Sequence, residues 1–168
     1  MTVRKAFLMT DAELKKHLEA AEKSPKFIAG AVSGLKPEVL RYKASPEKWS
    51  ILEILAHLAD AEIIMAYRIR QMLADKEPTI APIDQDAWAS NLGYMQEVPA
   101  ELVASYGLNR YANVRLLKRI KPADLEKGAF HPELNRKVTV GEMVERMAAH
   151  GPNHLQQIER LKEQAGKK

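Results

Sequence analysis

The sequence predicts an all-α protein, a four-helix bundle with an up-down-down-up order of helices. Apolar residues recur at helical spacing in four separate segments, and three of these segments begin with Ser or Thr three residues before Glu. One connection, between the second and third helices, is more than 20 residues long. Because strand signals are scarce and no repeat is present, we expect a single domain over residues 1–168.

The first predicted helix begins at Thr10, which forms a capping box with Glu13, and it ends near Gly34. The dipeptide Ser24-Pro25 interrupts its apolar pattern, because proline lacks the N–H that a helix interior requires. The sequence therefore predicts either one kinked helix or two helices in series.

The second helix is predicted over residues 50–74, with Ser50 and Glu53 as a second capping box. Its apolar face consists of Ile51, Leu55, Leu58, Met65, Ile69 and Met72. A long connection follows, in which residues 84–92 are expected to form a helical turn or two. A connection of this length can return the chain to the same end of a bundle, which favours parallel second and third helices.

The third helix is predicted to start near Pro99 and to stop before Pro122. The last helix opens at Thr139, whose capping-box partner is Glu142. Residues 137–140 are the only strand candidate. These boundaries complete the four helices of the expected bundle.

Composition excludes several classes of function. The chain has no cysteine, which excludes disulfides, thiolate metal ligands and a cysteine nucleophile. The formal net charge is +4, but no basic stripe with interleaved aromatic residues is present, so we expect no nucleic-acid partner. The apolar runs are too short for a signal peptide or a membrane span, so we expect a cytoplasmic protein with no membrane partner.

Three histidines form a candidate metal site. His150 and His154 are one helical turn apart, on the apolar stripe that should face the bundle interior. Two buried imidazoles need polar partners, and a divalent metal ion would serve both, although a role without metal remains open for this pair. His57 lies at the edge of the apolar face of the second helix, so all three could meet in the core. Three protein ligands leave a position open, as in catalytic rather than structural sites.

The stretch between two of these histidines contains Gly151-Pro152. Proline cannot donate to the carbonyl of Ala148 and crowds it, so we expect a distortion over residues 148–152. One alternative is a new helix that starts at Pro152 and leaves His150 outside. In-phase apolar residues on both sides favour one kinked continuous helix, with both imidazoles reaching the same ion as His57.

Four stretches resemble the DinB/YfiT-like family of metal-dependent enzymes. They are EVLRYKASPEKWSILEILAHLADAE (residues 38–62), EPTIAPIDQDAW (77–88), HPELNRKVTVGEM (131–143) and HGPNHLQQI (150–158). The resemblance implies an up-down-down-up bundle, often a homodimer, with one divalent ion, usually zinc or nickel, on three histidines. These match His57, His150 and His154. The sequence departs from the family where it has Asn153 in place of a frequent histidine.

The resemblance also implies a class of activity. Some relatives are transferases or isomerases that use a low-molecular-weight thiol such as bacillithiol, mycothiol or glutathione. We therefore expect thiol-dependent S-transferase chemistry on a small-molecule substrate, with the thiol supplied as a cofactor because the chain lacks cysteine. The alternatives are a metal-dependent hydrolase and a non-catalytic metal-binding bundle that acts in protein assembly.

Four further residues are candidates for the same site. Glu53 lies one turn before His57 and could act as a fourth ligand or a base, although its capping role explains it equally well. Tyr106, Asn109 and Asn113 lie on the inner stripe of the third helix, near the expected level of His57. They are predicted to contact substrate, the alternative being buried hydrogen bonds within the bundle.

Overall fold

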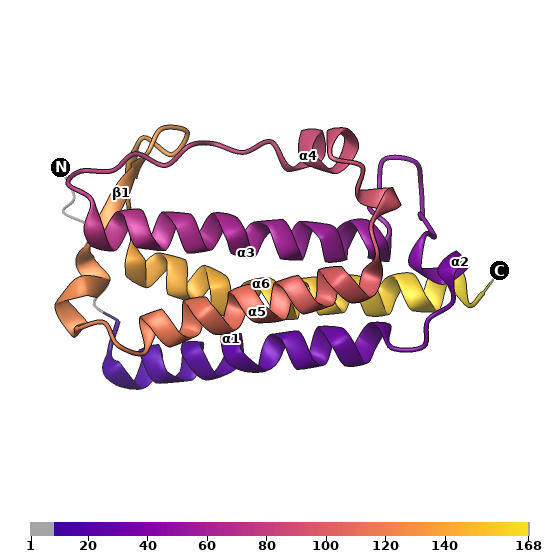
Figure 1. Cartoon of the computed structure of the whole chain (residues 1–168), viewed down its shortest axis with the longest axis horizontal. Helices are drawn as coiled ribbons and strands as arrows, with labels where there is room; N and C mark the ends of the chain where they lie inside the picture. The colour runs from indigo at the N-terminus through magenta and orange to yellow at the C-terminus, as the bar shows by residue number, and fades with distance from the viewer. Residues whose placement is uncertain (1–8, 168) are drawn as a thin grey trace.

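The computed structural model describes residues 9–167, and four long helices form its bundle (Figure 1). They are α1 (Asp11–Val32), α3 (Ile51–Ala74), α5 (Pro99–Leu117) and α6 (Val140–Ala165). Helices α1 and α6 run in one direction, and α3 and α5 run in the other, so the predicted up-down-down-up order is confirmed. The ends of the expected domain, residues 1–8 and 168, lie outside the described residues.

Local sequence explains where the long helices begin. All three predicted capping boxes are present, at Thr10, Ser50 and Thr139, and each side chain accepts a hydrogen bond from the backbone of the Glu three residues later. Helix α5 begins instead with Pro99, whose missing N–H costs nothing at a first helical position. None of the helices in the described part of the chain has the length and apolar composition that a membrane crossing would need.

Two long helices, α1 and α6, have a proline in their interior, and both are continuous. The Ser24 hydroxyl donates to the carbonyl of Ala21 at 2.9 Å, which replaces the hydrogen bond that Pro25 cannot make. Helix α1 is therefore one helix and not two in series. Helix α6 likewise continues through Pro152, so the alternative in which His150 lies outside a new helix does not occur.

Short elements connect the long helices. They are α2 (Pro37–Leu40), α4 (Gln85–Asn91), the 3-10 helices η1 (Tyr94–Gln96) and η2 (Pro122–Glu126), and the strands β1 (Gly128–His131) and β2 (Arg136–Thr139). The two strands form an antiparallel hairpin, of which only the second was anticipated. Strand β1 has no clear alternation of buried and exposed residues. It lies very close to β2 at Gly128, where a Cβ would be 2.1 Å from the carbonyl oxygen of Val138.

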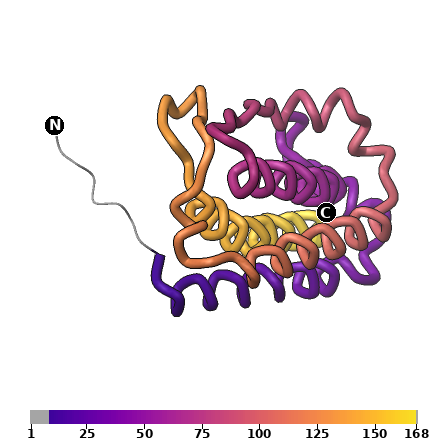
Figure 2. Tube along the Cα trace, turned by 60° about the vertical axis from the view of Figure 1, so that its left-hand side comes forward, coloured from indigo at the N-terminus to yellow at the C-terminus, as the bar shows by residue number. Residues whose placement is uncertain are grey.

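The long connection crosses the outside of α3 and returns the chain to the end where α5 begins (Figures 1 and 2). It is joined to the hairpin by two backbone hydrogen bonds, from Ile80 N to Phe130 O at 2.8 Å and from Phe130 N to Pro78 O at 2.9 Å. Connection and hairpin thus form a wall over one side of α3 and α6.

A polar layer divides the core of the bundle into two apolar clusters. Each long helix contributes to both clusters, and the layer between them contains side chains of α1, α3 and α5 and a backbone carbonyl of α6. The fully or almost fully buried polar members of the layer are Ser24, Glu62, Arg110 and Asn113. Arg110 donates to Glu62 Oε1 at 2.6 Å and to the carbonyl of Met147 at 2.7 Å, so the layer joins α5 to α3 and α6. His150 lies one turn after Met147 on α6, so the histidine cluster adjoins this layer.

Candidate metal centre

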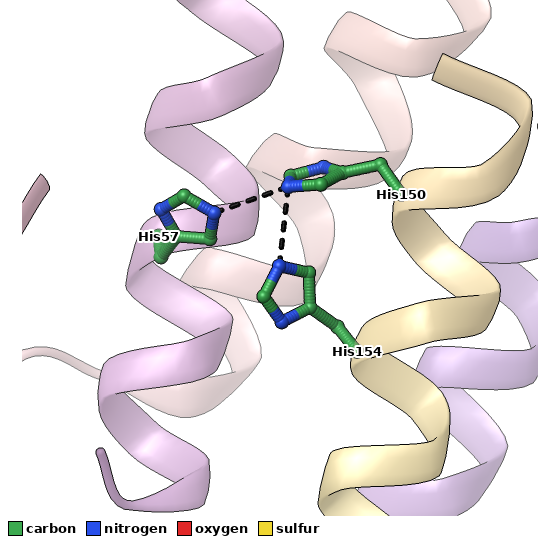
Figure 3. A group of neighbouring side chains, drawn as sticks. All are labelled: His57, His150 and His154. Atoms are coloured by element: carbon green, nitrogen blue, oxygen red, sulfur yellow. Dashed lines mark hydrogen bonds between the residues drawn. The ribbon is translucent and has the colours of Figure 1, made fainter. Parts of the chain in front are cut away.

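The three histidines converge between α3 and α6 (Figure 3). His57 extends from α3, and His150 and His154 extend from successive turns of α6. The Nε2 atom of His150 lies 3.1 Å from Nε2 of His57 and 3.1 Å from Nε2 of His154. One ring nitrogen from each lies within 4.8 Å of the others. The structure therefore brings together the residues that the sequence singled out, while metal binding by them stays a prediction.

Neighbouring side chains fix two of the rings. The indole of Trp49 packs against His57, with ring centroids 4.9 Å apart. The amide oxygen of Gln157, one turn after His154, lies 2.8 Å from His154 Nδ1. An oxygen acceptor at that distance places the ring proton on Nδ1, which leaves the lone pair of Nε2 facing the other histidines. This is the tautomer that a metal ligand requires.

Burial keeps the cluster neutral. Burial, followed by the nearby charge of His154, lowers the pKa of His57 to about 4 and that of His150 to about 2. Burial also lowers the pKa of His154. A neutral imidazole has one N–H and one lone pair, so three rings with their Nε2 atoms together cannot pair every nitrogen. His150 Nε2, for example, contacts two other Nε2 atoms and can serve as donor to one or as acceptor, but not both at once. A divalent cation at the common position would accept the lone pairs, so these residues fit a metal ion.

These pKa shifts predict how the stability of the metal-free protein depends on pH. Above pH 6.5 the three histidines are neutral in both the folded and the unfolded chain. Below pH 6.5 they bind protons in the unfolded chain but not in the folded chain. We expect the free energy of unfolding to fall as pH decreases from 6.5 towards 4. Urea denaturation of chelator-treated protein at several pH values measures this. If the free energy of unfolding of His57→Ala depended on pH as that of the wild-type protein does, the pH dependence would not come from the histidine cluster.

A cavity of about 260 Å³ adjoins the histidine cluster. It is enclosed by α3, α6, the long connection and the hairpin, and both His57 and His150 line it. Its apolar lining includes Ile64, Met65, Pro82, Ile83, Trp88, Leu134 and Met143, and its charged lining is Asp60, Arg68, Glu133 and Arg146. The cluster is thus accessible to a small molecule in this cavity, while His154 lies outside the cavity lining and is partly exposed.

Asp60 is a polar residue of this cavity that the sequence analysis missed. It follows His57 by three residues on α3, so the two side chains share a face. The Tyr94 hydroxyl donates to Asp60 Oδ2 at 2.6 Å. Burial and this hydrogen bond raise the pKa of Tyr94, so its hydroxyl remains a donor. The signal in the sequence was His-x-x-Asp on a helix.

Comparison with known proteins identifies the family. The family model described as DinB superfamily matches residues 20–158. The chain belongs to the DinB superfamily. Two relatives named "Putative metal-dependent hydrolase" are similar over most of their length. The protein from Oceanobacillus iheyensis is 25% identical over 91% of this chain and 88% of its own. The protein from Bacillus mycoides is 27% identical over 92% and 88%.

A solved structure supports the DinB-superfamily fold. YfiT from Bacillus subtilis, described as a "probable metal-dependent hydrolase with an unusual four-helix bundle topology", superimposes with a TM-score of 0.89. The alignment covers 99% of this chain and 94% of YfiT at 20% sequence identity. This similarity establishes the bundle topology, while the named relatives and the histidine cluster together support a divalent-metal protein.

The other candidate residues of this DinB-superfamily chain have partners within the bundle. Glu53 accepts from the Ser50 hydroxyl at 2.8 Å and pairs with Lys43 at 2.9 Å, so both of its oxygens are occupied. The Tyr106 hydroxyl is 2.9 Å from the Ser24 hydroxyl. Asn109 donates to the carbonyl of Ser105, and Asn113 donates to Glu62. None of these four residues lines the cavity beside the histidines.

Proposed function

We propose that the protein is a metal-dependent hydrolase of a small-molecule substrate, in which His57, His150 and His154 hold one divalent ion. The convergence of three Nε2 atoms beside a cavity carries this proposal. The names of the relatives from Oceanobacillus iheyensis and Bacillus mycoides support it. Neutral nitrogen ligands suit zinc and nickel, which are the metals we propose.

Three histidine ligands provide a site with open positions, as catalytic metal sites have. A divalent ion bound there would lower the pKa of a water molecule and polarise the bond that is cleaved. The neutrality of the three rings preserves the full positive charge for this purpose. His57 and His150 line the cavity, so water and substrate held in it would lie beside the cluster.

Asp60 is the residue that we assign as general base. Its Oδ2 is held by the Tyr94 hydroxyl at 2.6 Å, which leaves Oδ1 to accept the proton of the attacking water. It lines the same cavity as His57 and His150, whereas Glu53 does not. In the second half of the reaction the protonated Asp60 returns this proton to the leaving group.

The test compares Asp60→Asn with Asp75→Asn, which makes the same change at the C-cap of α3 and outside the cavity. We expect Asp60→Asn to retain its metal and to lower the metal-dependent hydrolytic rate by about 10²–10⁴-fold, a typical contribution of a general base. A panel of esters, amides and phosphate esters, assayed with zinc- and nickel-loaded protein, provides the rates. Equal rates in the two variants would refute the role of Asp60.

Thiol transfer is the second candidate, because the same open position would accept a thiol as readily as water. The absence of cysteine means that such a thiol has to be a cofactor. Bacillithiol, mycothiol or glutathione, added with an electrophilic acceptor, separates the two functions. If a metal-dependent rate appears only when a thiol is present, the proposed function is thiol transfer and not hydrolysis. Loaded protein that is inactive in both assays would favour a non-catalytic metal-binding bundle.

A further inference from the structure

Two arginines line the cavity beside the histidine cluster. Arg68 lies on α3 and Arg146 lies on α6, and both also line an adjoining hollow of about 410 Å³. The second hollow shares Arg68, His131, Leu134, Met143 and Arg146 with the first. The two guanidinium groups therefore lie where the two hollows meet, in contact with solvent-accessible space.

Neither arginine is neutralised by a protein carboxylate. Arg68 donates to the carbonyl of Ala81 at 2.6 Å, and its other donors have no partner within residues 9–167. Arg146 has no hydrogen bond or ion pair to any described residue. Burial and the charge of Arg146 lower the pKa of Arg68, which indicates that the two like charges act on each other. An uncompensated pair of this kind is stabilised by an anion.

None of the nearby acids in the described part of the chain forms an ion pair with either arginine. Asp60 accepts from Tyr94, and Glu142 pairs with Arg136 at 2.8 Å. Glu145 lines the second hollow without an ion pair among the described residues. Glu133 is exposed and acts on Arg68 only at long range, since no ion pair of 4.0 Å or less joins them in the described structure.

A histidine completes the arrangement. His131 ends strand β1 and lines both hollows. Its Nδ1 atom is buried and lacks a hydrogen-bond partner in the described part of the chain. Because His131 lines both hollows beside the two arginines, its ring is positioned to contact a ligand bound where the hollows meet.

The helices place both arginines on the same side of the histidine cluster. Arg146 precedes His150 by one turn, and Arg68 follows His57 by three turns, at about 1.5 Å per residue. Because α3 and α6 run in opposite directions, both displacements lead towards the hairpin end of the bundle (Figure 1). The lining between the histidines and the arginines is mainly apolar and includes Ile64, Met65 and Met143.

We propose that Arg68, Arg146 and His131 form an anion-binding subsite that holds a carboxylate or phosphate group of the substrate. The substrate is then an elongated molecule whose reactive bond lies at the histidines, whose middle is apolar and whose far end is anionic. This assignment deepens the proposed function, because it rests on the same cavity as the substrate site. The anionic end orients the molecule and makes the arginines specificity-determining residues.

The test measures ligand binding to chelator-treated protein by NMR titration, so that a metal ion cannot bind the anion. Benzoate and phenyl phosphate are the probes, and benzamide is the neutral analogue of benzoate. We expect both anions, or one of them, to bind at least about tenfold more tightly than benzamide, as one charge-assisted contact provides. Preference for benzoate would identify a carboxylate substrate, and preference for phenyl phosphate would identify a phosphate.

Variants assign the binding to the arginines. Arg146→Gln and Arg68→Gln should each weaken anion binding by about tenfold and leave benzamide binding unchanged. Arg160→Gln is the matched control, because Arg160 is an exposed residue of α6 outside both hollows. Glu133→Gln should strengthen anion binding. Equal binding of anions and benzamide, no saturable anion binding, or equal effects of Arg146→Gln and Arg160→Gln would overturn the proposal.

The two proposals fail separately in this design. If the protein binds no divalent metal but binds benzoate more tightly than benzamide, the anion-subsite proposal stands and the hydrolase proposal fails. The opposite result is a protein that binds metal, hydrolyses neutral and anionic esters equally well and shows no anion preference in the titration. In that case the hydrolase proposal stands and the anion-subsite proposal fails.

Discussion

Arg110→Ala is expected to lower the free energy of unfolding by about 3–5 kcal/mol, the usual cost of removing one partner of a buried ion pair. Arg110 and Glu62 are both 0% exposed and are joined at 2.6 Å. Without the guanidinium, the Glu62 carboxylate would retain a single partner among the described residues, the Asn113 amide at 3.2 Å. The carbonyl of Met147 and the hydroxyl of Ser24 would lose a donor as well.

Urea denaturation followed by circular dichroism measures this cost. Arg115→Ala is the control, because Arg115 lies on the same helix and is exposed; its substitution should change stability by less than about 1 kcal/mol. The double variant Arg110→Met, Glu62→Leu should be far more stable than Arg110→Ala, because it leaves no buried charge without a partner. Equal stability of the two single variants would show that the polar layer contributes nothing.

Gly151→Ala is expected to destabilise the fold and to disturb the histidine cluster together. A Cβ at Gly151 would lie 2.6 Å from Ser24 Cβ and 2.8 Å from the Tyr106 hydroxyl, so α1 and α6 would have to separate. Overpacking of this kind costs about 1–3 kcal/mol. Because Gly151 is flanked by His150 and His154, the same shift should weaken metal affinity by at least about tenfold, as loss of ligand-orienting contacts does.

Gly30→Ala provides the matched control for this prediction. A Cβ at Gly30 meets nothing within 4 Å, and the position is inside α1. Alanine there should stabilise the protein by up to about 1 kcal/mol through its higher helix propensity. Chemical denaturation gives the stability, and zinc competition with a chromophoric chelator gives the affinity. If Gly151→Ala and Gly30→Ala had the same stability and the same zinc affinity, the close contact of α1 and α6 at Gly151 would contribute to neither.

Local signals were sufficient to predict the helices and their order. The capping boxes at Thr10, Ser50 and Thr139 mark helix starts through hydrogen bonds within four residues, so no tertiary knowledge was needed. The histidines could be placed because His150 and His154 follow the same periodicity as the apolar core. The length of the connection before Pro99 indicated the parallel arrangement of α3 and α5.

Features that depend on distant contacts could not be predicted. Gly151 looked like a helix breaker, but its role is to let Ser24 of α1 approach α6. Asp60 became a site residue only when the connection brought Tyr94 back across α3. Asn113 belongs to a layer that also contains Glu62 and Arg110, which are far apart in the sequence. The hairpin strand β1 required its partner, since GAFH alone carries no strand pattern.

Elemental analysis of untagged protein tests the central claim most directly, namely that His57, His150 and His154 hold one divalent ion. The account predicts one equivalent of zinc or nickel in the wild-type chain, and loss of that equivalent in His57→Ala and in His150→Ala. His17→Ala, which removes a histidine of α1 outside the cluster, should retain the metal. Metal content that is the same in all three variants, or a wild-type chain that binds none after incubation with zinc or nickel, would contradict it.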